Sequence, residues 1–308
     1  MRAFLIRRLL SFIPTMLLFY TLVFTLIKLT PGNPWDTQEK PFRPEVLANL
    51  EAKYHYHDPI WKQYLDYLKS IFLHFDFGPS YKRNVDANDI VARYFPVSLQ
   101  LGLVAFIIAM SVGISLGVIS AVKKNTVTDH LARLFSVIGV ATPSFVVITL
   151  MIIFFAIELG ILPAYGWNGI FSKEIIIPAL ALSFAPMAVI ARFTRATMLE
   201  TIRTDYVRTA RSKGLAERSV MLRHALRNAL IPIVTISGVA LADLITGSFF
   251  VEAIYGIPGI GRYFVSTIAD KDYPVLMAVT LLFAALIWLA NFIADIAYAL
   301  IDPRVKVG

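Results

Sequence analysis

Long apolar runs, separated by short polar stretches, dominate this chain of 308 residues. Six of the runs reach or approach about 20 residues, the length that a helix needs to cross a hydrocarbon core. They cover residues 9–27, 97–122, 134–157, 175–191, 229–251 and 274–298. The fourth is the shortest and contains two prolines, which membrane spans tolerate when neighbouring helices satisfy the freed carbonyls. The pattern predicts an all-α polytopic membrane protein with six transmembrane helices.

Composition supports the membrane assignment, since 57% of the residues are hydrophobic and only 16% are charged. A soluble domain has about 25% charged residues. The absence of cysteine excludes a disulfide framework and a thiolate metal site. Arg2, Arg7 and Arg8 resemble the start of a signal peptide, but the apolar run behind them is longer than the usual run of about 7–15 residues. No small-residue cleavage site follows it, so we expect an uncleaved first span.

The distribution of Lys and Arg predicts the orientation of the chain. With the N-terminus inside, the inner segments contain 17 of these residues and the two short outer loops contain 3. Both termini are therefore expected in the cytoplasm. The expected divisions are a first span with its cytoplasmic N-terminus (1–29), an external segment (30–96), five further spans (97–298) and a cytoplasmic tail (299–308).

The external segment is expected to contain two short helices. Residues 45–54 follow a proline, a favoured first-turn residue, and residues 59–75 have apolar side chains near helical spacing. The aromatic residues of the second helix suit a position at the lipid headgroups or packing on the outer ends of the spans, and both interpretations stand. His55 and His57 do not share a helical face, so no metal site is expected.

The sequence contains no motif with a known catalytic mechanism. A P-loop, an H-E-x-x-H zinc motif and a G-x-S-x-G elbow are all absent. The glycine-rich stretch 255–262, "YGIPGIGR", follows the fifth run without a preceding strand, which favours a turn or short re-entrant structure over a phosphate site. We expect neither enzyme activity nor a bound cofactor for this chain.

Asp243 is the clearest ionisable residue within a predicted span. Charge is costly in hydrocarbon, so such a residue faces protein or a water-filled cavity. Either its carboxylate lines the path of a solute and attracts a positive group, or it is hydrogen-bonded to Thr246 or to a neighbouring helix. Asn291 and Asp295 are four residues apart on the last span, and we expect them to form a polar contact between helices.

The most basic segment is 205–228, "DYVRTARSKGLAERSVMLRHALRN", with six Lys/Arg and two acids. Its apolar residues form two helical stripes, one of Ile202, Tyr206 and Ala210 and the other of Leu222, Ala225, Leu226 and Ala229. Gly214 lies between them, where a helix would end with a residue at positive φ. The pattern predicts two helices joined by a glycine turn, with a small residue one turn before the bend that lets another backbone approach. Such a projection suits a partner protein.

Three other interpretations of this segment compete. A solvated basic loop would leave the two apolar stripes unexplained. Anionic lipid binding is compatible with a cluster of Lys and Arg beside a span. Nucleic-acid binding is disfavoured, because Tyr206 is the only aromatic residue in the segment and no recognised nucleic-acid-binding fold surrounds it.

The basic segment resembles the cytoplasmic EAA loop of binding-protein-dependent ABC importers. Ala210 and Gly214 lie four apart and precede a hydrophobic stretch, His224 and Pro232. Arg208-Thr209-Ala210 stands where the general pattern has Glu-Ala-Ala, as in oligopeptide and dipeptide permeases. The stretches "IRRLLSFIPT", "FDFGPS", "ATPSFV", "VEAIYGIPGIGRYFV" and "DPR" extend the resemblance to the B-type permease subunit of an oligopeptide importer over nearly the whole chain.

The resemblance implies a type I ABC importer permease fold in the bacterial inner membrane. The implied partners are a second homologous permease, two ATPase subunits that hold ATP and Mg, and an extracytoplasmic peptide-binding protein, with no nucleic acid. Docking to the ATPase is expected within a coupling segment, 192–228, at Asp205, Tyr206, Arg208, Ala210, Gly214, Leu215, His224 and Asn228. Asp243 stands where the family has a small residue, so the resemblance assigns it no role.

The substrate is the least determined part of the assignment. Oligopeptides are the expected substrate, because the match is to the oligopeptide branch. Nickel chelates and oligosaccharides remain open within the same class. A secondary transporter is the alternative outside it and would need ion-coupling groups and inverted repeats.

Overall fold

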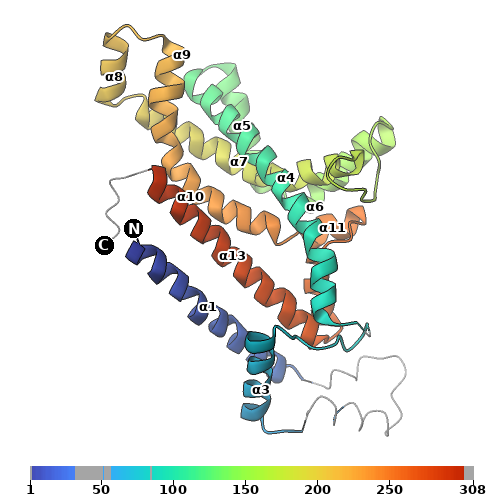
Figure 1. The fold of residues 1–308 in the computed structure, drawn as a ribbon. Helices are drawn as coiled ribbons and strands as arrows, with labels where there is room; N and C mark the ends of the chain where they lie inside the picture. Colours follow the sequence, from blue (N-terminus) through green and yellow to red (C-terminus); the bar gives the residue numbers. More distant parts are fainter. Residues whose placement is uncertain (1, 32–50, 52–56, 84, 302–308) are drawn as a thin grey trace. The chain divides into compact units, whose positions relative to one another are not determined.

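The computed structural model describes residues 2–31, 51, 57–83 and 85–301 of the chain, and these residues fold into helices without any strand (Figure 1). The chain divides into two compact units. Unit 1 comprises Met1–Leu5, Val97–Pro258 and Leu286–Gly308, and unit 2 comprises Ile6–Pro96 and Gly259–Ala285. The helix expected at 45–54 lies outside the described residues apart from residue 51. Over the rest, the predicted all-α class is confirmed.

The six apolar runs are largely helical, and the third and fifth of them are each divided between two helices. The long helices are α1 (Arg2–Leu29), α4 (Ala87–Val122), α7 (Ile176–Thr201), α10 (Leu226–Ile245) and α13 (Tyr273–Ile301). The shorter ones are α3 (Ile60–His74), α5 (Val127–Ala141), α6 (Ser144–Met151), α8 (Asp205–Ser212), α9 (Glu217–Ser219), α11 (Phe249–Tyr255) and α12 (Gly261–Ala269). Within the described residues, five helical segments are long and apolar enough to cross a membrane, and a bent pair makes six if it counts as one span.

The third run is not the single straight span that the sequence predicts. α5 is followed by α6 and a π-helical turn, Ile152–Glu158 (η1), and the helix axis bends by 111° between α5 and this second arm. The bend lies at Thr142 and Pro143 in "ATPSFV". Proline has no N–H for the helical ladder and disfavours the α conformation in the residue before it. Thr142 is accordingly extended, at φ −95° and ψ 119°.

The boundaries of the fourth and fifth spans also differ from the prediction. α7 continues to Thr201, ten residues beyond the apolar run, because buried Thr194 and Met198 continue its inner face. The fifth helical segment begins at Glu217, passes through a π-helical turn, Val220–Ala225 (η3), and ends at Ile245 rather than residue 251. Ser248 then begins α11 by accepting a hydrogen bond from the backbone N of Val251 at 3.3 Å.

α7 is the central helix of unit 1 and packs against α5, α6 and α10 (Figure 1). It is more buried than the other spans. α4 also approaches it closely, at Gly117. A Cβ atom at Gly117 would lie 2.4 Å from the Cβ of Thr194, so only glycine permits this separation. Small residues at helix interfaces are a common means of close packing in membranes.

A buried carboxylate joins three helices of unit 1. Asp129, near the start of α5, is fully buried. It accepts hydrogen bonds from Arg195 of α7, Nε to Oδ1 at 2.6 Å and Nη2 to Oδ2 at 2.9 Å. Ser120 of α4 donates to Oδ1 at 2.6 Å, and the backbone N of Asn125 donates to Oδ2 at 2.9 Å. The carboxylate therefore fixes the ends of α4, α5 and α7 to one another.

Unit 2 is built on the packing of α3 against α1. Tyr20 is fully buried, and its hydroxyl donates to the carbonyl of Tyr64 at 2.7 Å. Ile71 of α3 is buried in the same cluster, with Met277 and Leu281 of α13. The helix predicted at 59–75 is thus confirmed, and it packs on a span as the second of the two interpretations expects.

Candidate functional site

The basic segment forms the predicted helix, glycine turn and helix. α8 ends near Gly214, whose φ is +72° and whose N donates to the carbonyl of Arg211 at 2.9 Å. Glycine adopts positive φ without the steric cost that other residues meet. Arg211 bridges the turn with two hydrogen bonds to Glu217, from Nη2 to Oε1 at 2.8 Å and from Nε to Oε2 at 3.2 Å. The turn is therefore a defined structure, and we call residues 205–219 the projection.

The projection is attached firmly to the span that follows it. α8 lies against η3, and Asn228 of α10 donates from Nδ2 to the hydroxyl of Tyr206 at 2.7 Å. Beneath α8 lies a cluster of buried apolar residues that includes Met198, Val207 and Val220. These contacts hold α8 against the beginning of the fifth helical segment.

The eight expected docking residues differ in their exposure. Those exposed on the surface of this chain are Asp205, Tyr206, Arg208, Gly214, Leu215 and Asn228, while His224 is half-buried. Ala210 is only 5% exposed and belongs to the buried cluster. Its small side chain permits α8 to pack closely on its own chain, which differs from the expected role of admitting a partner's backbone.

α10 carries an exposed stripe along one face. Asn228, Pro232, Thr235, Val239 and Asp243 are all exposed, at spacings of four, three, four and four residues. Residues at these spacings lie on the same side of a helix. The opposite side is buried and includes Ala229, Ile233, Ser237, Gly238 and Ala242. The stripe ends in a carboxylate, which is not suited to contact with lipid tails.

Asp243 lies two residues before the end of α10. Thr246 donates from Oγ1 at 3.0 Å, but to the backbone carbonyl of Asp243 and not to its carboxylate. Within the described part of the chain, no hydrogen bond or ion pair is found for that carboxylate. The expected contact with Thr246 therefore satisfies the backbone carbonyl of Asp243 and not its carboxylate.

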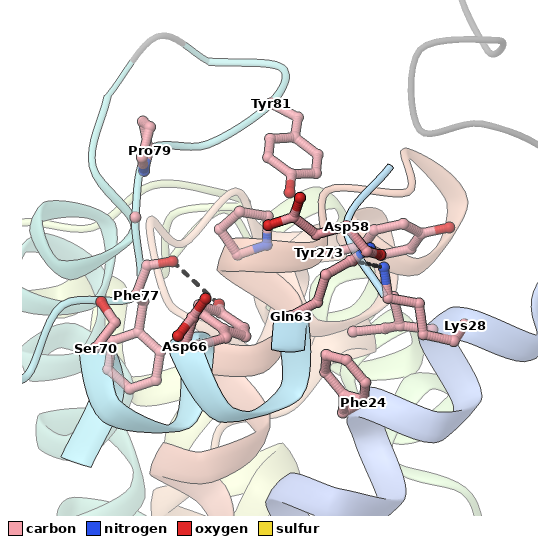
Figure 2. A pocket seen from close by; sticks show the side chains of 14 residues that line it. Phe24, Lys28, Asp58, Gln63, Asp66, Ser70, Phe77, Pro79, Tyr81 and Tyr273 are labelled. Atoms are coloured by element: carbon pink, nitrogen blue, oxygen red, sulfur yellow. Dashed lines mark hydrogen bonds between the residues drawn. The ribbon is translucent and has the colours of Figure 1, made fainter. Parts of the chain in front are cut away.

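Unit 2 contains a cavity of about 340 Å³ beside α1 and α3 (Figure 2). Lys28 of α1 donates to Gln63 of α3 at its edge, and Tyr67 donates to the carbonyl of Phe77 at 3.0 Å. Asp58 and Asp66 also line the cavity. Asp58 is paired with Lys62 at 2.8 Å. The aromatic walls and the carboxylate of Asp66 suit a cationic side chain, because cations are attracted to both.

The sequence analysis did not predict the burial of three acidic residues, Asp129, Glu252 and Asp272. Glu252 accepts a hydrogen bond from Ser98 at 2.6 Å within unit 1. Asp272 accepts hydrogen bonds from Ser80 at 2.5 Å and Arg83 at 3.0 Å within unit 2. All three lie beyond the apolar runs or near their ends, where an isolated acid is ordinarily solvated, so no periodic signal distinguishes them. In the described residues, no group of three or more His, Cys, Asp or Glu side chains is placed to hold a metal ion.

Comparison with known proteins accounts for both halves of the chain. The family model described as "Binding-protein-dependent transport system inner membrane component" matches residues 113–307, and the corresponding N-terminal model matches residues 1–102. The chain is 47% identical to the oligopeptide transport system permease protein OppB of Salmonella typhimurium, over 99% of this chain and all of the relative. It is 43% identical to the dipeptide transport system permease protein DppB of Bacillus subtilis, over 100% and 99% of the two chains.

A solved structure confirms the architecture. A chain of the MetNI methionine ABC transporter, in an inward-facing conformation, superposes with a TM-score of 0.57 and 18% identity. The superposition covers 70% of this chain and 97% of that one. At this identity the likeness concerns the fold, and it supports the type I importer permease fold implied by the sequence resemblance. With sequence and fold in agreement, the chain belongs to the family of binding-protein-dependent transport system inner membrane components.

Proposed function

We propose that this chain is a permease subunit of an ATP-driven peptide importer and forms the translocation path for oligopeptides with a second, homologous permease. The observation that carries the proposal is the 47% identity to an oligopeptide permease over 99% of the chain. The dipeptide relative agrees on the class of substrate. The chain itself is a non-catalytic subunit, and two separate ATPase subunits supply ATP hydrolysis.

The projection is the contact with an ATPase subunit. Its exposed side chains, Tyr206, Arg208 and Leu215, support this assignment, because they face away from the buried cluster beneath α8. The excess of Lys and Arg in the inner segments supports a cytoplasmic location of the projection and of both termini. ATP and the loaded binding protein then drive the switch of the spans, because each binds one state more tightly than the other, and such differential binding is what shifts a conformational equilibrium.

The external segment 30–96 is the contact with an extracytoplasmic peptide-binding protein. The cavity beside α1 and α3 supports this location, because its aromatic and acidic lining offers a place for a cationic side chain of that protein (Figure 2). Lys62, near the start of α3, is about half exposed and pairs with Asp58 at 2.8 Å, so this ion pair lies at the edge of the same surface.

The function is tested by reconstitution in liposomes with the partner permease, the ATPases and the binding protein. Peptide-loaded binding protein is expected to stimulate ATP hydrolysis and peptide uptake together. Binding protein loaded with a nickel chelate or an oligosaccharide is the comparison for the other substrates. Stimulation by one of those alone reassigns the substrate, and peptide uptake that persists without ATP would support a secondary transporter instead.

Asp243 lines the translocation path in this proposal. The exposed stripe of α10 supports it, because a carboxylate among exposed residues of a span requires water or protein on that side. At this position the carboxylate attracts the amino group or the cationic side chains of a passing peptide.

Asp243→Asn is expected to reduce the uptake of a lysine-containing peptide several-fold more than that of a neutral peptide. A charge interaction in a wet path is worth about 1 kcal/mol, which corresponds to roughly a fivefold change in rate. The measurement is uptake of the two peptides in competition, with Asp243→Glu as the control that retains the charge. If the ratio of lysine-containing to neutral peptide uptake is the same in wild type and Asp243→Asn, the carboxylate has a structural role and does not attract the peptide.

A further inference from the structure

Another cavity, of about 230 Å³, lies in unit 1 between α4, α5 and α7. Its walls are mostly apolar, and its lining includes Arg133, Arg192 and Arg195. The three arginines come from the first half of α5 and the last three turns of α7. The cavity therefore lies towards the end of the spans from which α7 leads to the projection.

The arginines are only partly neutralised. Arg195 is committed to the buried Asp129 by two hydrogen bonds. Arg133 lies 3.8 Å from the same carboxylate, too far for a hydrogen bond, and its side chain is 47% exposed. Arg192 is exposed and lies over the ring of Phe193. Because no acidic side chain of the described chain lines the cavity, its mouth has an excess of two positive charges.

The combination of arginine side chains and apolar walls favours a ligand that has both an anionic group and an apolar part. Guanidinium groups bind phosphate oxygens with paired hydrogen bonds, so the mouth suits a phosphate. A free phosphate ion would gain nothing from apolar walls, whereas a phospholipid carries acyl chains next to its phosphate. Basic pockets between spans on the cytoplasmic side are known to hold acidic lipid headgroups.

We infer that this cavity binds an anionic phospholipid of the cytoplasmic leaflet, with its phosphate on Arg133 and Arg192 and its chains along the apolar walls. The inference rests on the proposed function for its orientation, which puts these helix ends at the cytoplasmic surface. Asp129 serves the site indirectly, because it fixes Arg195 between α5 and α7 and so keeps the two helices at the spacing that the cavity requires.

The test uses the assembled transporter in vesicles that contain phosphatidylglycerol and phosphatidylethanolamine. Native mass spectrometry after detergent extraction measures which lipids remain bound. Wild type is expected to retain phosphatidylglycerol in preference, and Arg133→Gln with Arg192→Gln is expected to lower that preference by about an order of magnitude. The matched control is Lys123→Gln with Lys124→Gln, which removes the same charge from the exposed turn between α4 and α5, outside the cavity.

The inference is overturned if the arginine pair and wild type retain the lipid equally, or if the lysine pair lowers retention as much as the arginine pair. Displacement of the lipid by excess inorganic phosphate would mark a general anion site and overturn the lipid assignment. Equal melting temperatures in phosphatidylethanolamine alone show that the variants are folded, and the single Arg192→Gln variant replaces the pair if they are not. Peptide uptake in the same vesicles tests the proposed function separately, since a transporter without lipid preference overturns only this inference.

Discussion

Asp129→Asn is expected to lower the free energy of unfolding by about 3–5 kcal/mol, because removal of one member of a buried ion pair leaves the other charge uncompensated. The variant leaves Arg195 beside a neutral amide, between α5 and α7. It also weakens the acceptor for Ser120 of α4. The measurement is the midpoint of thermal unfolding of the purified protein, converted to free energy with the measured enthalpy.

A double-mutant cycle distinguishes the ion pair from a general loss of packing. Asp129→Asn with Arg195→Gln is expected to be more stable than the sum of the two single changes predicts, since neither charge is then left alone. The control is Arg208→Gln, whose partner Asp205 lies 3.6 Å away with both side chains largely exposed. Exposed pairs of this kind contribute about 0–1 kcal/mol, and a larger effect there than at Asp129 would contradict the prediction.

Ala210→Asp is expected to abolish the association of this chain with its ATPase while the spans remain inserted. The new carboxylate would be buried among Val207, Met198 and Val220, and burial of an unpaired charge is strongly unfavourable. α8 would therefore separate from η3 and the projection would lose its shape. The measurement is co-purification of the ATPase, with protease protection of the external segment as the check on insertion.

Two further variants test how far the association with the ATPase depends on the structure of the projection. Ala210→Ser is expected to retain association, because a serine hydroxyl can donate to a carbonyl of its own helix. Gly214→Val is expected to weaken association, since a β-branched residue at φ +72° is strained. Space around Gly214 is open, so the effect is smaller than that of Ala210→Asp. Retained association in Ala210→Asp would refute the docking proposal.

The sequence predicts the helical class and the approximate location of the apolar helices, because the apolar runs are long and the signal depends on length and hydropathy alone. It does not predict the bend in the third run. The ends of the helices are less predictable. In α7 the helix outlasts the apolar run, since the inner face continues through Thr194 and Met198 while exposed Arg192 and Glu200 interrupt the hydropathy. A hydropathy average along the sequence combines the buried and exposed faces of a helix. It therefore predicts the end of the helix at the point where only the exposed face becomes polar.

The candidate site shows the same division between local and tertiary information. The turn at Gly214 is a local property, and its positive φ was predictable from two stripes broken by a glycine. The burial of Ala210 and Asp129 is a tertiary property, because each depends on helices far away in the sequence. The sequence predicts Ala210 as a small residue that contacts a partner, and the structure shows that it is buried in the cluster beneath α8.

The uninterrupted helical segment Glu217–Ile245 has a mechanical consequence. At about 1.5 Å per residue, its 29 residues make a rod about 44 Å long. Its near end carries the turn that Arg211 clamps, and its far end carries Asp243. The segment contains no loop between its two ends. A displacement of the end at Glu217 would therefore tilt or translate the end that carries Asp243. The hydrogen-bond pattern departs from that of a regular α-helix at two places along this segment, the π-helical turn η3 and Pro232, which has no N–H to donate. Bending under load is expected at these two places.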